Sequence, residues 1–464
     1  MKAKLKFIFA QCSLILFILL AVFPQNILAQ TNYYWSTPVS TLTGGGQPAG
    51  VAIDTAGNIF IADNSKNVIL KAKPSGASWI VTTNWTATII AGSNSIAGGT
   101  SNGTNGVARF YQPSGVAVDI TDNIYVADSG NNCIRKITPS GTNWIVTTIA
   151  GVANSDGAGD NDGTNGAAQF GNPIGIAVDT AGNLFIGDNG NDTIRKIRHS
   201  GTNWITTTIA GSAATAGSFA DGTNGVAGFN YVLGVAVDAA DNVYVADGQN
   251  NLIRKVRPSG TNWITTTVAG QLPIDGVPQS GSADGTNFDA QFNSPFAVSV
   301  DNAGNIYVAD NGNNTIRRLT PSGTNWIVTT IGGLAGVSGP PLVNGTNDSA
   351  VFSSPLGVVA DSVGNVYVAD ASDDALRLGL IFPPLLQMTQ ATNQATLFYP
   401  ALLGTNINFI LQSATNLANN SWVTATNIGS SSPAQWKLAT GGMPYINFTL
   451  TNKVPDRFFR LHLP

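Results

Sequence analysis

The stretch Gly115-Val-Ala-Val-Asp-Ile-Thr-Asp-Asn-Ile-Tyr-Val-Ala-Asp128 joins two short apolar runs through a polar turn. Runs of this length, rich in Val, Ile and Tyr and bounded by Asp and Asn, predict two β-strands of a hairpin. Similar stretches begin at five other places along the chain: Gly50, Gly175, Gly234, Ala297 and Gly357. A repeat of this kind fixes the architecture before any single residue can be interpreted.

The rest of each repeat supplies two more strands. Cys133-Ile-Arg-Lys-Ile137 follows the quoted stretch, then come a Pro-Ser-Gly-Thr-Asn turn and the run from Trp144 to Ala150. The Asp that ends the second strand recurs every 59 to 65 residues, with no helical periodicity between copies. The sequence therefore predicts an all-β protein with one four-stranded antiparallel sheet per repeat, six in all, arranged as a β-propeller.

The ends of the repeat array predict how the ring closes. Repeats one to five each contain a fourth strand, whereas repeat six stops near Leu380 and runs into Pro383-Pro384. The segment from Tyr34 to Thr43, before repeat one, has the aromatic start and Thr-rich tail of a fourth strand. We therefore expect residues 31–380 to form a six-bladed β-propeller closed by an N-terminal strand, which hides the sheet edges that an open array exposes.

The repeated runs resemble a known family. Pro-x-Gly-Val-Ala-Val-Asp, Gly-Asn-Ile-Tyr-Val-Ala-Asp and Asn-x-Ile-Arg-Lys-Ile are similar to NHL repeats, of the type found in secreted bacterial propellers with a small C-terminal β module. Two features depart from that pattern: the period is longer, and Leu70 stands where most copies carry Arg. The resemblance implies the fold; NHL-type propellers include protein binders, RNA binders and a few lyases, so it does not imply one function.

The N-terminus predicts export from the cytoplasm. Met1-Lys-Ala-Lys-Leu-Lys6 is basic, residues 7–23 are apolar, and Ile27-Leu-Ala29 resembles a cleavage site. We interpret residues 1–29 as a cleaved signal peptide, with a membrane anchor as the alternative. Cleavage leaves no transmembrane segment, and the mature protein is expected to be secreted, periplasmic or at the cell surface. Cys133 is then the only cysteine, and its apolar surroundings predict a buried thiol.

Beyond the repeats, residues 385–464 contain short β-type runs such as Asn408-Phe-Ile-Leu-Gln412 and Arg457-Phe-Phe-Arg-Leu461. They predict a small β-sandwich-like domain. Its resemblance to C-terminal modules of large secreted bacterial proteins implies surface display only by analogy.

Charge argues against nucleic acid as a partner. Removing Lys2, Lys4 and Lys6 leaves 19 basic residues against 26 acidic ones, a net charge of about −7. Nucleic-acid binding needs clustered Lys and Arg, whereas here one Arg recurs on each third strand from repeat two onward. We interpret these arginines as blade-to-blade hydrogen-bonding groups or as part of a solvated outer strand. They are Arg135, Arg195, Arg254, Arg317 and Arg377.

Groups suited to catalysis or metal binding are scarce. All 26 acidic residues are Asp, and 12 of them occupy the two repeated strand-end positions, where a carboxylate accepts backbone N–H bonds of a turn. The run Asp128-Ser-Gly-Asn-Asn132 looks like a calcium loop but lacks its downstream acidic ligand. The only histidines are His199 and His462. The resemblance implies that lyases and lactonases of this fold use His, Glu or Asp at the central channel. We therefore predict no catalytic residue, no metal and no cofactor.

The connections on one face of the ring are the candidate binding surface. In a four-stranded antiparallel blade, the loop between strands two and three shares a face with the loop to the next blade. The inter-blade loops carry their own repeat, exemplified by Asp162-Gly-Thr-Asn-Gly-Ala-Ala-Gln-Phe170. We expect its Phe to be an anchor between blades and its Gly-Thr-Asn tip to lie in water. Trp144 and its counterparts are interpreted as packing at the rim, with sugar stacking as the alternative.

Seven polar residues that vary between repeats are the candidate partner-binding residues. They are Ser129, Asn189, Asp192, Gln249, Asn311, Ser372 and Asp373. Short polar side chains suit adaptable hydrogen bonding to a protein loop or a glycan, and they equally suit solvated turns. We expect a non-enzymatic, secreted or cell-surface scaffold that binds protein or carbohydrate. The alternatives are a metal-dependent lyase or lactonase and a structural envelope protein. Bound metal, together with activity that a chelator abolishes, would distinguish the enzyme from the binding scaffold.

Overall fold

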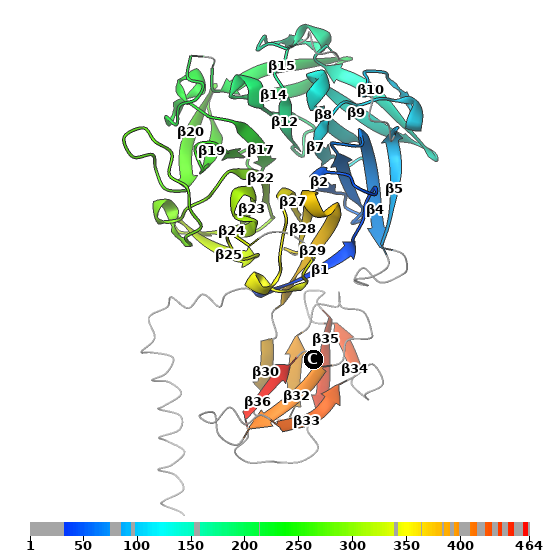
Figure 1. The fold of residues 1–464 in the computed structure, drawn as a ribbon, viewed down its shortest axis with the longest axis vertical. Helices are drawn as coiled ribbons and strands as arrows, with labels where there is room; N and C mark the ends of the chain where they lie inside the picture. The colour runs from blue at the N-terminus through cyan, green and yellow to red at the C-terminus, as the bar shows by residue number, and fades with distance from the viewer. Residues whose placement is uncertain are drawn as a thin grey trace, which may run out of the picture.

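The computed structural model describes residues 32–382, apart from 75–84, 94–97, 153–157, 213, 338–341 and 363, together with seven strands between residues 385 and 462. Residues 32–382 form six antiparallel sheets arranged as blades around a central opening (Figure 1). The all-β, six-bladed propeller expected from the repeats is confirmed.

Each blade runs from the centre outward in chain order. Blade 1 contains β2 (Pro48–Ile53), β3 (Ile59–Asp63), β4 (Val68–Pro74) and β5 (Trp85–Gly92). Blade 2 contains β7 (Pro113–Val118), β8 (Ile124–Asp128), β9 (Cys133–Ser140) and β10 (Asn143–Ala150). Blade 3 contains β12 (Pro173–Val178), β13 (Leu184–Asp188), β14 (Thr193–Ser200) and β15 (Asn203–Ala210).

The remaining blades follow the same order. Blade 4 contains β17 (Val232–Val237), β18 (Val243–Asp247), β19 (Leu252–Ser259) and β20 (Asn262–Ala269). Blade 5 contains β22 (Pro295–Val300), β23 (Ile306–Asp310), β24 (Thr315–Ser322) and β25 (Asn325–Gly332). Blade 6 contains β27 (Pro355–Ala360), β28 (Val366–Asp370), β29 (Ala375–Phe382) and, from the other end of the propeller, β1 (Asn32–Val39).

A fifth, two-residue strand covers the outer edge of blades 2 to 6. These strands are β6 (Gly103–Thr104), β11 (Gly163–Thr164), β16 (Gly222–Thr223), β21 (Gly285–Thr286) and β26 (Gly345–Thr346). They are the Gly-Thr of the inter-blade loop repeat, so this part of the loop is a strand and not a free tip. Short edge strands leave little unpaired backbone for other chains to pair with.

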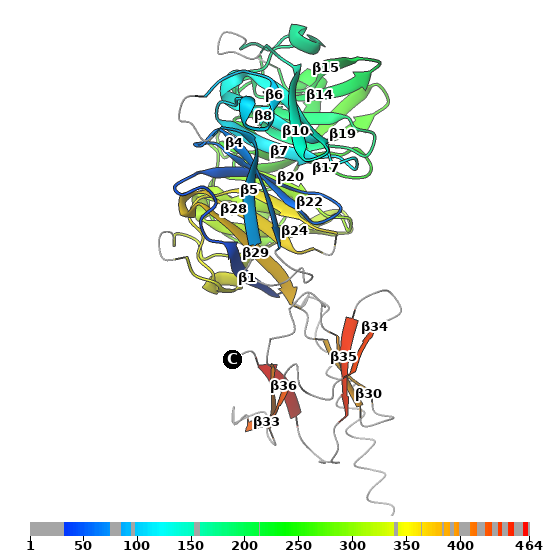
Figure 2. The same ribbon diagram turned by 90° about the vertical axis from the view of Figure 1, so that its right-hand side faces the viewer.

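The N-terminal strand closes the ring, as the strand count predicted. Strand β1 pairs antiparallel with β29, from Asn32 opposite Phe382 to Val39 opposite Leu376. Both views place β1 against β29 in the last blade (Figures 1 and 2). Trp35 in β1 is fully buried, and its indole N–H donates to the carbonyl of Ile331 at 2.8 Å, which ties the closing strand to blade 5.

The first strands of neighbouring blades lie very close together. This close approach explains the Gly with which most of the repeats begin. A Cβ placed on Gly115 would lie 2.2 Å from the carbonyl oxygen of Ile174 in the next blade, and one on Gly175 would lie 2.3 Å from that of Leu233. Side chains cannot fit at such separations. The repeated Gly therefore sets the inner diameter of the ring.

Packing between neighbouring blades holds the ring together. Trp204 of blade 3 meets Tyr125 of blade 2 edge to face, with ring centroids 6.0 Å apart, and Lys136 places its ammonium 5.9 Å from the Trp204 ring. The same arrangement joins Trp144 to Phe60 and Trp263 to Phe185. The tryptophans thus pack between blades, which agrees with their interpretation as packing residues.

Two predicted segments fall partly or wholly outside the described residues. The signal peptide at 1–29 and the cleavage site lie there. Between residues 385 and 462, the strands form a four-stranded sheet, β30 (Leu385–Thr389), β31 (Gln394–Phe398), β35 (Pro444–Thr449) and β34 (Gln435–Leu438), and a three-stranded one, β33 (Val423–Ile428), β32 (Phe409–Ala414) and β36 (Phe458–His462). The sandwich arrangement of these sheets stays a prediction. Among the described residues, no helix has the length and apolar character to cross a bilayer.

Candidate functional site

The loop face is the side of the propeller that carries the inter-blade loops and the turns between the second and third strands. Backbone hydrogen bonds join the two kinds of loop: the N–H of Gly130 donates to the carbonyl of Tyr111, and that of Gly190 to Gly171. The expectation that both lie on one face is confirmed. The turn between the second and third strands is a short 3-10 helix in some blades and an irregular turn in the others. It ends in a residue of positive φ, such as Asn132 at 52°.

These positive-φ residues link each blade to the next. The backbone N–H of Asn172 donates to Oδ1 of Asn132 at 2.7 Å, and that of Ser354 donates to Oδ1 of Asn314 at 2.8 Å. The same bond is made by Asn67, Asp192 and Asn251. In blade 6 the equivalent Asp374 accepts the backbone N–H groups of Thr43 and Gly45. Most of the Asn and Asp side chains at these positions therefore form hydrogen bonds between neighbouring blades.

The Asn of each Gly-Thr-Asn segment has a structural role at the outer rim. Asn165 has a φ of 52°; its Oδ1 accepts the backbone N–H of Trp204 at 2.8 Å, and its carbonyl accepts the N–H of Gly151. It therefore joins the fourth strands of blades 2 and 3. The counterparts Asn105, Asn224 and Asn287 bond the Trp of their own blades in the same way. The expectation of a solvated tip is wrong for Asn and correct for Thr164, which is exposed.

The repeated arginines are buried and donate hydrogen bonds to the main chain of the inter-blade loops. Arg195 is fully buried; it pairs with Asp188 at 2.8 Å and donates to the carbonyls of Gln169 and Asn161 in the loop. Its guanidinium carbon lies 5.1 Å from the centroid of the buried Phe170 ring. The same set recurs around Arg135, Arg254, Arg317 and Arg377. The hydrogen-bonding interpretation is confirmed, and the solvated-strand alternative is wrong.

Blade 1 is the one blade that lacks this arginine, and the way its inner strand is reached explains why. Its inner strand is reached directly from β1, so no Gly-Thr-Asn and Phe loop precedes it, and its sheet has four strands. Leu70 stands in place of Arg and packs in a core cluster with Leu42 and Leu376. Asp63 instead accepts the backbone N–H of Gln47 at 3.1 Å. Without that loop, a buried guanidinium would lack the loop carbonyls that accept its N–H groups in the other blades, and Leu avoids this cost.

The Asp that ends each first strand forms the turn that follows it. Oδ1 of Asp179 accepts the backbone N–H of Asn183 at 2.8 Å, and Oδ2 accepts the side-chain amide of the same Asn at 2.7 Å. The turn role expected for the repeated Asp is what the structure shows at the first strand ends, whereas Asp188 at the end of a second strand pairs with Arg195 and accepts the backbone N–H of Gly171 in the inter-blade loop. In the described part of the chain, no group of three or more His, Cys or Asp side chains is placed to bind a metal ion.

Burial acts strongly on the second-strand carboxyls. Loss of solvation raises the pKa of Asp188 and Asp247 to about 6, against the opposing effect of the paired arginine in each case. The pKa of Asp370 is raised further, to about 7, by burial and by the neighbouring Asp373 carboxylate. Asn191 and Asn250 donate to the buried Asp of their blades, whereas blade 6 has Asp373, which cannot donate when ionised.

The structure assigns structural roles to most of the seven candidate partner-binding residues. The hydroxyl of Ser129 is buried against the carbonyl of Pro173, Asn189 donates to the carbonyl of Val232, and Asn311 donates to Ser354 and Pro355. These three side chains bridge adjacent blades, and Asp192 accepts the N–H of Tyr231. These four residues therefore also have a role within the ring, and their binding of a partner stays a prediction. Gln249 and Ser372 are exposed, and Asp373 is half-buried.

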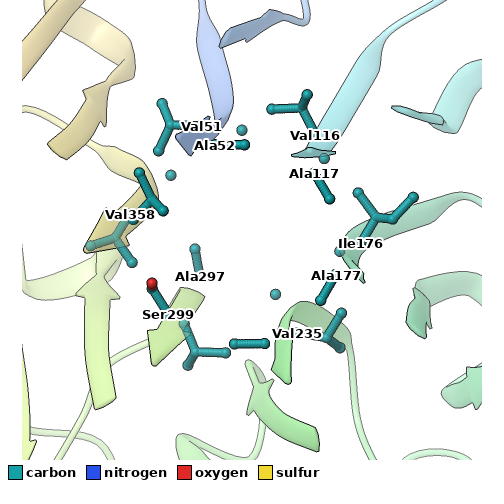
Figure 3. A pocket seen from close by; sticks show the side chains of 18 of the residues that line it. Val51, Ala52, Val116, Ala117, Ile176, Ala177, Val235, Ala297, Ser299 and Val358 are labelled. Atoms are coloured by element: carbon teal, nitrogen blue, oxygen red, sulfur yellow. The ribbon is translucent and has the colours of Figure 1, made fainter. Parts of the chain in front are cut away.

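The central channel is a cavity of about 210 Å³ walled by the first strands of all six blades. Figure 3 shows small aliphatic side chains around it, among them Val51, Ala117 and Ile176. Of the lining side chains, only Ser114 and Ser299 carry polar atoms, and Ser299 accepts the backbone N–H of Ala360 at 3.1 Å. None of the residues that line this cavity has a titratable side chain.

Blade 4 departs from the repeat on the loop face, at a position that the sequence reading missed. Tyr231 has a φ of 59° and a side chain that is 53 % exposed, where other blades carry smaller residues such as Gln112 and Asn172. It precedes Val232, whereas Pro follows the equivalent residue in the other five blades. Comparing the six copies position by position, and asking which one breaks the pattern, would have found it.

The comparisons with known proteins support the fold. The NHL repeat family model matches residues 110–137 and 292–319. These two stretches run from the Phe anchor to the third strand of blades 2 and 5. NHL repeat-containing protein 2 of Gallus gallus is 26 % identical over 374 residues, covering 75 % of this chain and 48 % of the relative. The chain spans about half the length of that relative, or less for others, such as 40 % of the human protein of the same name.

Solved structures resemble the chain at low sequence identity. An auxiliary nutrient binding protein from Bacteroides thetaiotaomicron has a TM-score of 0.52 and 14 % identity, covering 76 % of this chain and 77 % of that one. A virginiamycin B lyase from Staphylococcus aureus has a TM-score of 0.45 and 14 % identity, covering 75 % and 100 %. The chain is a six-bladed β-propeller that carries NHL repeats.

Proposed function

We propose that this propeller is a non-enzymatic binding scaffold, secreted or displayed at the cell surface, which recognises protein or carbohydrate through its loop face. The observation that carries the proposal is the wall of the central channel, which is aliphatic and offers no group for proton transfer or metal ligation. Catalysis by general acids, bases or nucleophiles needs such groups at one place.

The repeated charged residues support the same conclusion. In blades 2 to 6 the buried Asp that ends the second strand pairs with an Arg, and each of these Arg also donates to two loop carbonyls, so both groups already have partners within the ring. An active site needs an asymmetric set of groups, and residues that repeat in five blades do not supply one. What varies between blades is the loop face, where variable loops stand on a rigid scaffold.

Two measurements on the mature protein, residues 30–464, test the proposal. A pull-down from a mixed extract together with a glycan array should return a specific ligand. Metal analysis of the purified protein should find no stoichiometric metal, and lyase and lactonase assays should show no turnover. Stoichiometric calcium with chelator-sensitive turnover would contradict the proposal in favour of an enzyme. If the protein is found at the cell surface and captures no ligand, the result would favour a structural envelope component over a binding scaffold.

A further inference from the structure

Asn230, Tyr231 and Gln249 are brought close together by backbone hydrogen bonds on the loop face of blade 4. Two backbone hydrogen bonds connect them: the N–H of Gly248 donates to the carbonyl of Tyr231, and the N–H of Gln249 to that of Asn230, each at 3.0 Å. Tyr231 and Gln249 are exposed and Asn230 is half-buried. None of the three side chains makes a hydrogen bond to another described residue, so their polar groups are available to a ligand.

The backbone beneath the tyrosine is held firmly. Asp192 of blade 3 accepts the N–H of Tyr231 at 2.7 Å and that of Gly217 at 3.3 Å. A carboxylate that accepts two backbone donors holds the main chain at Tyr231 in place.

The conformation of Tyr231 is one that bulky residues rarely adopt. A φ near +59° favours Gly, Asn and Asp, and the equivalent positions in blades 2, 3, 5 and 6 hold Gln112, Asn172, Ser294 and Ser354. A large aromatic side chain at this site is unfavourable for folding, yet it is not buried and packs in no core cluster. Strained residues that the surrounding structure holds in place occur preferentially at ligand sites.

We infer that Tyr231, with Asn230 and Gln249, forms a subsite for a neutral saccharide. An exposed tyrosine offers an apolar face for the C–H surface of a sugar ring and a hydroxyl at its edge. The two amides each supply a donor and an acceptor, which matches sugar hydroxyls. The carboxylate beneath, Asp192, is already occupied by backbone donors, and the buried Asp247 is paired with Arg254 at 2.7 Å. The hydrogen bonds leave the negative charge of Asp192 in place, and this charge disfavours an acidic sugar at the subsite.

This inference rests on the proposed function and names its ligand class and location. The test is native gel electrophoresis of the mature full chain through gels cast with a β-glucan, a galactomannan, a xylan or a soluble α-glucan, with pectin as an acidic comparison. We expect at least one neutral polysaccharide to retard the wild-type protein. Tyr231→Asn should weaken that retardation at least tenfold and Gln249→Ala several-fold.

The repeat supplies the matched controls. Asn stands at the Tyr231 position in blade 3, so Tyr231→Asn is compatible with the backbone and the variant should fold. Gln112→Asn introduces the same residue at the equivalent position of blade 2, and this variant should bind as the wild type does. Equal retardation of the wild type and Tyr231→Asn, or retardation by pectin alone, would overturn the inference. Capture of a protein partner with no retardation by any neutral polysaccharide would overturn it while leaving the proposed function standing.

Discussion

At the scale of single residues, the number of backbone donors explains the choice between Asn and Asp at the positive-φ position of the loop face. Asn132 receives one backbone N–H, from the residue before a Pro. Asp192 receives the N–H groups of Tyr231 and Gly217, and Asp374 those of Thr43 and Gly45. A carboxylate has more acceptor positions than an amide, so it stands where two or more donors converge.

The residue that breaks the pattern in blade 6 gives a prediction about stability. Replacing Asp373 with Asn should restore the donor that Asn191 and Asn250 provide to the buried Asp of their blades. Near pH 8 we expect the free energy of unfolding to rise by roughly 1 kcal/mol, the value of one net hydrogen bond. Denaturant unfolding followed by circular dichroism measures the change. Asn131→Asp in blade 2 makes the reverse exchange and should destabilise.

The same carboxyls give the sign of the pH dependence. Burial raises the pKa of Asp370 from its ordinary value of 3.8 to about 7, and burial also raises that of Asp373. Between these values the folded protein binds a proton that the unfolded chain has released, so stability falls as the pH rises through this window. Asp373→Asn should make that fall smaller. A variant that is less stable than the wild type at both ends of the window would contradict the assignment.

At the scale of elements, the inter-blade loop depends on its Phe more than on its strand residues. Phe170 is fully buried between blades under the Arg195 guanidinium, whereas the side chain of Thr164 is exposed. Phe170→Ala should therefore lower the free energy of unfolding by about 3 to 5 kcal/mol and Thr164→Ala by less than about 0.5 kcal/mol. Thermal and denaturant unfolding of both variants check this. Equal losses at the two sites would show that the loop is held in another way.

The closing strand is the second element with a clear energetic role. Trp35 lies wholly inside the interface of blades 5 and 6, edge to face with Phe352 at 4.9 Å. Trp35→Ala should cost about 3 to 5 kcal/mol, and deletion of residues 31–44 more, because backbone partners are lost as well. Thr37→Ala, which loses only an exposed hydrogen bond to Asn344, is the matched control. An unchanged melting temperature after the deletion, without aggregation, would refute ring closure by β1.

The repeats made the elements predictable, but tertiary contacts decided the roles of single residues. The strand count gave six blades and the closing strand because each repeat contributes the same four runs. The inter-blade hydrogen bonds of Ser129 and Asn311 could not be read, since they join residues more than 40 positions apart. A polar residue that varies between repeats looks the same in sequence whether it faces solvent or a neighbouring blade.

At the scale of the whole molecule, we expect folding without a metal. The two repeated Asp of each blade accept hydrogen bonds from backbone, Asn or Arg donors, and a ligand that does not bind cannot shift the folding equilibrium. Prolonged chelation should leave the melting temperature of the mature protein unchanged within about a degree. A fall of several degrees that calcium reverses would show that a cation belongs to the ring.

The most direct test of the central claim, that ligands bind at the loop face and not in the channel, compares capture by two variants. Tyr231→Asn changes the loop face, and Ala177→Leu fills part of the aliphatic channel wall. Pull-down and glycan-array binding are measured for both alongside the wild type, with melting temperatures to confirm folding. The account predicts that the channel variant captures the same ligand as the wild type and that the loop-face variant loses it. Loss of capture by the channel variant with full retention by Tyr231→Asn would contradict the account.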